Sequence, residues 1–397
     1  MRISGDARRS VPLDAGPVEQ PQHRSGRRAA GLIFAALILV AAFLFAAPYI
    51  SSGIRQGYSF LSGQAATGPG FVSTTGQSNT TGGVSTSAPE CSAVVAVKSL
   101  APPDIKNGTA DIAYPSDYCA LATYALQQIN SDRAANGTGP VSLGYNQAAQ
   151  QHADSMIYYG YFSHFDTQGY KPYMRYSLLG GRGADFENVA YFSYSVSHFT
   201  STSAVEEGMR VLEHSMVYND SACCSNGHRY NILSPLHNVV SIGVAYNSTT
   251  LFFDEEFEND YVSLSFAMTS ASAPDPYFVT MTGALTQQVS APGSIYIGFD
   301  GTPVPATRVE LNGAPHEYGP GTLVGGVLPP DLFGSCGQFT QGITICARTW
   351  KFSSAGVDIA FSLSEFVKGY GPGVYTLYLI TGSSTDSAIT SMSIFVQ

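Results

Sequence analysis

Apolar and polar residues alternate in two different ways along this chain, and the change separates two folded regions. Across residues 116–218 the apolar positions recur three and four residues apart, which predicts helices at 116–136, 146–160 and 203–218. The runs 239–246 and 250–258 then read as strands, with a turn at Asn247-Ser248 between them. Helices followed by a hairpin indicate an α+β domain of about 150 residues.

After residues 272–277 the pattern becomes one of short β-rich runs between Gly and Pro turns, which predicts an antiparallel β-sandwich. The runs are 294–299, 307–311, 342–352, 357–363, 373–380 and 388–396. Aromatic residues in such strands usually pack. The sandwich is therefore expected either to pack against the first domain or to bind surface glycans through exposed tyrosines and Trp350.

The N-terminal region predicts a membrane anchor. Residues 29–50 are apolar and uncharged, long enough for a helix to span the ~30 Å hydrocarbon layer. The preceding tail, 1–28, carries six arginines against three acidic residues, which places it in the cytoplasm. Cleavage near Ala46 and Pro48 is the alternative. Residues 51–90, rich in Ser, Thr and Gly, predict a flexible stalk, and 91–114 an ordered lead-in.

The charge of the chain indicates which classes of partner it can bind and on which side of the membrane its bulk is expected. The 397 residues have a formal net charge of -10, and only 12% are charged, so no basic surface for phosphates is expected and nucleic-acid binding is excluded as a function class. With a cytoplasmic tail, the bulk of the chain is expected to be extracellular on a single-pass anchor in the cell membrane. Five sequons on that side make the chain a candidate glycoprotein: Asn79, Asn107, Asn136, Asn219 and Asn247.

Candidate chemistry is concentrated between residues 164 and 235. Three short motifs supply it: SHFD at 163–166, FENVA at 186–190 and GHRYNILSP at 227–235. Each is expected at a loop or helix edge, where a scaffold can direct polar side chains into a cleft. The sequence contains neither an HExxH zinc motif nor a GxSxG nucleophile elbow, which disfavours those two hydrolase classes.

These motifs, in this order over residues 117–260 with QQINSDRAANG, AAQQHADSM and SIGVAY, resemble the CAP superfamily of cysteine-rich secretory proteins, antigen 5 and pathogenesis-related proteins. The chain is most similar to the prokaryotic, often archaeal, SCP-like branch. The resemblance implies an α-β-α sandwich at 115–262, followed by a linker at 263–275 and the β-sandwich at 276–397. It also implies a surface cleft with two histidines and two acidic residues.

Three of those four cleft residues have direct matches: His164, Glu187 and His228. The position of the second acid falls on Ser215, where prokaryotic members commonly have serine. Glu213 is near it but is expected to face another side of the helix, because successive helical residues are about 100° apart. The insertion MVYNDSACCSN separates this helix from His228.

The cleft allows three functions that the sequence leaves open. It could bind an extracellular ligand or envelope component without turnover, serve as a purely structural network, or hold Zn²⁺ through His164 and His228 for metal-assisted hydrolysis of peptides, lipids or envelope polymers. Fold likeness alone does not choose among them. The other histidines rank lower: His152 is expected to pack in a helix, whereas His198, His237 and His316 have no recognisable partners.

The six cysteines are compatible with three disulfides. Cys336 and Cys346 flank a hairpin-like segment, and Cys91 and Cys119 could tie the lead-in to the first helix. The adjacent Cys223 and Cys224 could form a vicinal bridge or bond elsewhere. Sequence alone does not settle the pairing.

Overall fold

The computed structural model describes residue 91, residues 105–106 and 109–110, and residues 114–269, 274–315 and 317–397. The predicted anchor at 29–50, the stalk, most of the lead-in, Asn79, Asn107 and His316 lie outside the described residues. Within the part that is described, no helix combines the length and apolar character needed to cross a membrane.

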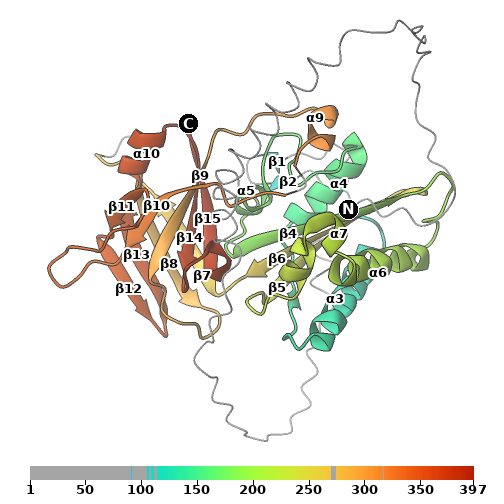
Figure 1. The fold of residues 1–397 in the computed structure, drawn as a ribbon, viewed down its shortest axis with the longest axis horizontal. Coiled ribbons are helices and arrows are strands. Elements are labelled where there is room, and N and C mark those ends of the chain that lie inside the picture. Colours follow the sequence, from blue (N-terminus) through green and yellow to red (C-terminus); the bar gives the residue numbers. More distant parts are fainter. Residues whose placement is uncertain (1–90, 92–104, 107–108, 111–113, 270–273, 316) are drawn as a thin grey trace, which may run out of the picture. The chain divides into compact units, whose positions relative to one another are not determined.

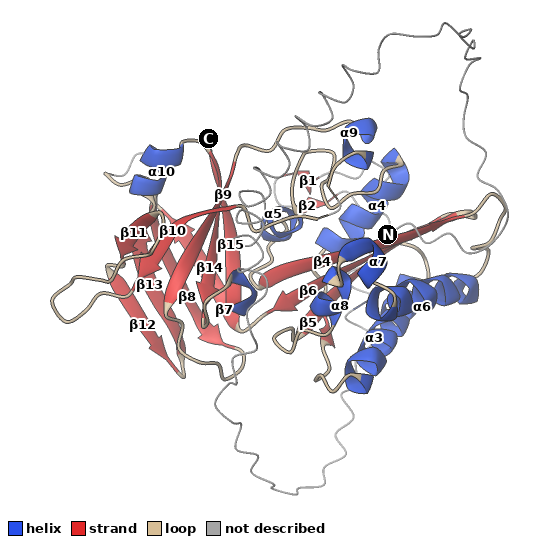
Figure 2. Cartoon of the chain, viewed as in Figure 1, coloured by secondary structure: helices blue, strands red, loops and turns tan. Residues whose placement is uncertain are grey.

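The first domain is a four-stranded sheet with helices on both faces. Its strand order is β3-β5-β6-β4, with β3 (Ser142–Leu143) parallel to β5 (Val239–Tyr246). The other neighbours, β5 with β6 (Thr250–Asn259) and β6 with β4 (Ala184–Ser193), are antiparallel. Helices α3 (Tyr118–Ala135) and α6 (Thr202–Tyr218) pack together on one side, and α4 (Ala148–Tyr159) packs on β5 and β6 (Figures 1 and 2). This is the expected α-β-α arrangement.

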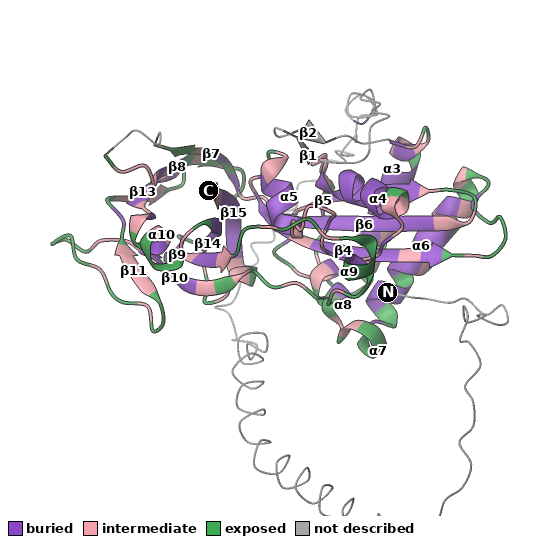
Figure 3. Ribbon diagram, turned by 90° about the horizontal axis from the view of Figure 1, so that it is seen from above, coloured by how far each residue is buried: buried purple, intermediate pink, exposed green. Residues whose placement is uncertain are grey.

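Alternation along β6 builds a different interior on each face of that sheet. Leu251, Phe253 and Phe257 join the core beneath α3 and α6. Phe252 joins the smaller core beneath α4, and the carboxyl residues 254, 256 and 258 share its side of the strand. Figure 3 shows β5 and β6 buried along most of their length. One face of β6 therefore contributes apolar side chains to the core beneath α3 and α6, and the other face carries the buried acidic side chains on the side of α4.

The long helices begin and end close to the expected positions. The Ser201 side chain accepts a hydrogen bond from the Ala204 amide at the start of α6, and Gly160 ends α4 in the left-handed conformation, at φ 69°. Gly243 of β5 lets α4 approach closely, because a Cβ there would lie 2.1 Å from the Ala149 carbonyl oxygen. The 247–250 turn forms the predicted β5–β6 hairpin.

Three shorter helices were not predicted from the sequence, and the FENVA motif is not in a loop. The helices are α5 (Pro172–Leu178), α7 (Ser221–Cys224) and α8 (Gly227–Ile232). FENVA lies inside β4, which pairs with β6 over its whole length. Most residues of this edge strand are buried, including the polar Glu187 and Asn188.

The second domain is a two-sheet sandwich, as expected. One sheet has the order β11-β10-β9-β14-β15 and the other β12-β13-β8-β7. The strands are β7 (Val262–Met268), β8 (Phe278–Leu285), β9 (Ser294–Asp300), β10 (Thr322–Leu328), β11 (Ile343–Cys346), β12 (Thr349–Ser353), β13 (Gly356–Ser362), β14 (Gly373–Ile380) and β15 (Ala388–Val396). A helix, α10 (Ser364–Tyr370), and a 3-10 turn at 385–387 complete it.

Three expectations for this domain are corrected. Residues 263–268 belong to strand β7 rather than to a linker, because Val262 and Leu264 are buried in the sandwich core. The run 307–311 forms helix α9 (Arg308–Asn312), since Thr307 and Glu310 make a reciprocal capping box. The β10–β11 pair is parallel, so the sandwich is not wholly antiparallel.

Three disulfides join Cys91 to Cys119, Cys223 to Cys224 and Cys336 to Cys346, and they account for all six cysteines. The first ties the lead-in, with its short strands β1 (Ile105–Lys106) and β2 (Thr109–Ala110), to α3. The second is the vicinal bridge that the sequence left open.

The connection between β9 and β10, residues 301–321, reaches from the sandwich onto the first domain. Leu311 is buried in the core beneath α4, and the Phe162 amide donates to Asn312 Oδ1 at 3.0 Å. Beside it, Lys171 and Tyr173 both donate to Asp300 at the end of β9, at 2.7 and 2.6 Å. The two domains therefore share polar and apolar contacts beside the 162–173 segment.

Candidate functional site

Glu187 of β4 is the centre of a buried network that includes His164. His164 Nδ1 lies 2.6 Å from Glu187 Oε2, and His152 Nδ1 of α4 lies 2.7 Å from Glu187 Oε1. The guanidinium of Arg175, on α5, donates to the same Oε1 and also to the His164 carbonyl oxygen at 2.8 Å. Two of the predicted cleft residues are thus in direct contact, held by two residues that the sequence interpretation did not place there.

Charge in this network is concentrated on Glu187 and Arg175. Burial alone would raise the pKa of Glu187, but the positive charge of Arg175 and the hydrogen bonds of His152 and His164 outweigh it and hold that pKa below its usual value. Burial, together with the charge of Arg175, lowers the pKa of His152 to about 4. Glu187 is therefore an ionised carboxylate, and His152 is a neutral ring beside it.

Because an ionised carboxylate only accepts hydrogen bonds, the proton of a neutral His164 ring lies on Nδ1. Nε2 of His164 is then left with its lone pair. This atom has no hydrogen-bond partner among the described residues, and it is absent from the fully buried polar atoms without one. The side chain is 9% exposed. His164 therefore presents a hydrogen-bond acceptor at the surface.

His228, on α8, is held in the same way by a different acid. Its Nδ1 lies 2.7 Å from Oδ1 of Asp220, whose Oδ2 accepts from the Arg229 amide at 3.1 Å. Burial lowers the pKa of His228 despite the opposing effect of Asp220. His228 is also 9% exposed in its side chain. The two histidines reach the edge strand β4 from opposite faces of the sheet.

The second acid, which the sequence left open, is not supplied to a histidine by Ser215 or Glu213 in the described part of the chain. Ser215 is buried within α6, and Glu213 is buried as well, where burial and the neighbouring carboxyl of Glu255 raise its pKa. Neither side chain is hydrogen-bonded to a histidine in the described part of the chain. The acid hydrogen-bonded to His228 is Asp220, which lies in the insertion after α6.

Two asparagines of the sequence motifs fix α8 against β4. Asn231 donates to Asn188 Oδ1 at 3.0 Å and to the Phe186 carbonyl oxygen at 3.1 Å. Nε2 of His237 lies 2.8 Å from Asn231 Oδ1. These bonds explain why FENVA and GHRYN occur together: they position the helix that carries His228.

Tyr318, from the 301–321 connection, forms a wall beside His164. Its hydroxyl accepts from the Glu187 amide at 2.6 Å, and its ring centroid is 4.7 Å from that of His164. The sequence interpretation missed this residue because it lies in the other domain, 131 positions after Glu187.

A metal shared by His164, Glu187 and His228 does not fit the geometry well. Among the described residues, two sets offer metal ligands within 4.8 Å of one another: Asp220, Cys223, Cys224 and His228, and the fully buried His152, Glu187 and Asp254. Neither unites His164 with His228. In the second set the Arg175 guanidinium already supplies the positive charge.

Two cavities, of about 440 and 250 Å³, lie elsewhere. The larger is lined by residues of both domains, including Tyr176, Arg182 and Glu258, and the smaller by Phe165, Lys171 and Asp300. Neither of these two cavities is lined by His164 or His228.

Comparison with known proteins identifies the family that the first domain matches. Residues 126–262 match the model of the cysteine-rich secretory protein family, CAP. One similar solved structure is the CAP domain of enterococcal PrgA, at 14% identity and a TM-score of 0.28, covering 43% of this chain and 70% of that one. The search of curated proteins found no match. Residues 126–262, which carry His164, Glu187 and His228, therefore form a CAP domain.

Proposed function

We propose that this protein is an anchored cell-surface CAP protein that binds a ligand, without turnover, at the site formed by His164, Glu187 and His228. The observation that carries the proposal is that each imidazole is held at Nδ1 by a buried carboxylate, Glu187 or Asp220, at the same strand edge. This arrangement fixes the orientation of both rings, and the side chain of each is 9% exposed. Two imidazole rings held in fixed orientations are typical of a binding surface, since histidines that only pack do not need a carboxylate to orient them.

The protonation pattern indicates the chemistry of the ligand. With Nδ1–H of each ring directed at a carboxylate, the two Nε2 atoms are acceptors when the rings are neutral. An imidazole acceptor is complementary to a ligand that donates hydrogen bonds, such as the hydroxyl groups of an envelope glycan. A ligand that offers only acceptors would be repelled.

The test uses the full chain in detergent, labelled with ¹³C at the histidine Cε1. Soluble fragments of envelope glycan are the probe, and NMR follows the ring signals. We expect the signals of His164 and His228 to shift together, and the fragment affinity to fall at least tenfold in His164→Ala and His228→Ala. His198→Ala, an exposed histidine outside the site, is the matched control.

Two outcomes would overturn the proposal. Fragments that leave both signals unchanged would exclude glycan binding, and unfolding of both alanine variants would identify the network as structural. Stoichiometric zinc that is lost in His164→Ala would favour the metal-assisted hydrolase instead.

The anchor is the second part of the proposal, and the uncharged run 29–50 supports it. We expect the full chain to remain with membranes after alkaline carbonate extraction, and a chain lacking residues 29–50 to be released. External protease should degrade the C-terminal bulk in intact cells. Release of the full chain by carbonate would contradict the anchor.

A further inference from the structure

We propose that Asp220, Cys223, Cys224 and His228 form a redox-controlled site for a soft divalent cation such as Zn²⁺. The vicinal disulfide closes the site, and its reduction to two thiols opens it. The inference does not depend on ligand binding at the histidine cleft, although His228 belongs to both.

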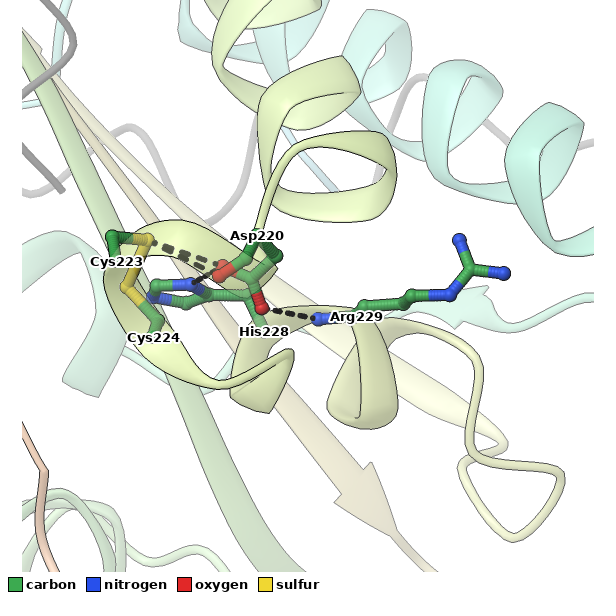
Figure 4. Close-up of a disulfide and its surroundings, with 5 residues drawn as sticks. All are labelled: Asp220, Cys223, Cys224, His228 and Arg229. Atoms are coloured by element: carbon green, nitrogen blue, oxygen red, sulfur yellow. Dashed lines mark hydrogen bonds and ion pairs between the residues drawn. A yellow bond between two sulfur atoms is a disulfide. The ribbon is translucent and has the colours of Figure 1, made fainter.

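The four side chains are brought together by a short, sharply turned segment. Helix α7 carries both cysteines, and the chain then reverses through Ser225 and Asn226, which have φ values of 51° and 66°. Two successive non-glycine residues in the left-handed region are unfavourable and persist only where the surroundings require them. The reversal places His228 beside the cysteines, and the ligand atoms of all four side chains lie within 4.8 Å of one another (Figure 4).

The two non-sulfur ligands are fixed in advance. Asp220 is 1% exposed, with Oδ1 on His228 Nδ1 at 2.7 Å and Oδ2 on the Arg229 amide at 3.1 Å. The Arg229 guanidinium, drawn away from the disulfide in Figure 4, donates to Val217 and Asn136 and so does not neutralise the carboxylate. In the part of the chain that the structure describes, this buried carboxylate therefore faces the sulfurs without an ion pair to Lys or Arg.

The disulfide is accessible to a reductant, whereas Asp220 and His228 beside it are buried. Cys223 is exposed and Cys224 half-buried, and α7 has no buried residue. Cys223 Sγ lies 3.5 Å from Asp220 Oδ1. After reduction, a thiol at this position can donate its hydrogen to the carboxylate, and a thiolate can share a cation with it.

The chemistry of the open site is that of zinc. A dithiol reductant would cleave the Cys223–Cys224 bond, becoming a disulfide itself and leaving two thiols on the protein. Binding of the cation then releases the two thiol protons to solvent. Two thiolates, an imidazole and a carboxylate are ligands that Zn²⁺ takes in tetrahedral sites, whereas Ca²⁺ and Mg²⁺ require mainly oxygen ligands.

The experiment adds Co²⁺ as a spectroscopic probe to the full chain before and after reduction with a phosphine. The phosphine takes oxygen from water to become the oxide as the disulfide becomes two thiols. We expect one additional Co²⁺ per chain after reduction, with an intense thiolate-to-cobalt absorption band in the near ultraviolet. The oxidised chain should show neither.

The matched variants are Cys223→Ser with Cys224→Ser, and Cys336→Ser with Cys346→Ser. The first pair should abolish the band, whereas the second, also a partly exposed disulfide, should leave it unchanged. Asp220→Asn, which keeps the shape of the side chain, should weaken Co²⁺ binding at least tenfold. This variant keeps the test valid if the serine pair fails to fold.

Three results would overturn the proposal. The first is that reduction adds no Co²⁺ to the chain. The second is that the absorption band persists without Cys223 and Cys224, because other thiols then produce it. The third is that the affinity for Co²⁺ is unchanged in Asp220→Asn.

Discussion

The carboxyl groups buried along β6 should make the CAP domain more stable in mild acid than at neutral pH. Burial raises the pKa of Glu255 and Glu258 to about 7 and that of Glu256 to about 8. A group whose pKa is higher in the folded state holds its proton more tightly there. Its stabilising contribution is therefore complete below the usual value of about 4.5 and is lost as the pH rises through 7 to 8.

Glu258 allows the magnitude to be worked out for a single residue. Its Oε1 and Oε2 accept from Ser241 at 2.7 Å and from Tyr176 at 2.5 Å, but desolvation outweighs both bonds. A rise from about 4.5 to about 7, at about 1.4 kcal/mol per pH unit, corresponds to roughly 3 kcal/mol lost between pH 4.5 and neutrality. Glu258→Gln keeps the shape and a hydrogen-bonding amide but cannot ionise.

The assay is urea unfolding of the full chain in detergent, followed by ellipticity at 222 nm, because the long helices α3, α4 and α6 lie in the CAP domain. We expect the free energy of unfolding of the wild type to fall from pH 5 to pH 8, and the fall to be about 3 kcal/mol smaller in Glu258→Gln. Glu207→Gln, the same change at an exposed site of α6, is the control. The reasoning is refuted if the wild type is as stable at pH 8 as at pH 5, or if Glu258→Gln has the wild-type slope.

Three further changes test other contacts by the same unfolding assay. Arg175→Met should cost about 3–5 kcal/mol because Glu187 would remain charged and buried without its partner, and a loss below about 1 kcal/mol would contradict this. Tyr318→Phe removes the acceptor of the Glu187 amide and should cost about 1–2 kcal/mol, so an unchanged stability would show that water replaces the hydroxyl. Cys91→Ser with Cys119→Ser should cost about 3 kcal/mol by freeing a 28-residue loop, unless the lead-in contributes nothing to folding.

Sequence patterns predicted the regular elements well and the site only in part. The hairpin of β5 and β6 and the three long helices follow from apolar periodicity, which burial on one face dictates. Strand β4 was not predicted because its motif contains the polar residues Glu187 and Asn188, which are buried although their polarity suggests an exposed loop. Helix α9 escaped it because a local capping box outweighs β-branched composition.

The partners of the site histidines could not be read from spacing alone. His152 was ranked as a packing residue, but it touches Glu187 and Asp254, which are 35 and 102 positions away. The run DEEFE inside an otherwise apolar strand was the available signal, because acids in a buried strand need polar or protonated partners. Asp220 lies in an insertion relative to the family motifs, where a resemblance offers no position to compare.

The edge position of β4 explains why the second domain matters to the histidine site. An edge strand presents unpaired amides, and here the Glu187 amide is satisfied by the Tyr318 hydroxyl from the sandwich. The same contact places an aromatic ring against His164, while the β15 residue Ser391 donates through its hydroxyl to the Gly183 carbonyl oxygen just before β4. Removing the sandwich would therefore leave the Glu187 amide without its partner and remove one wall of the site. It follows that residues 126–262 alone contain the two histidines but not the complete surface that surrounds them.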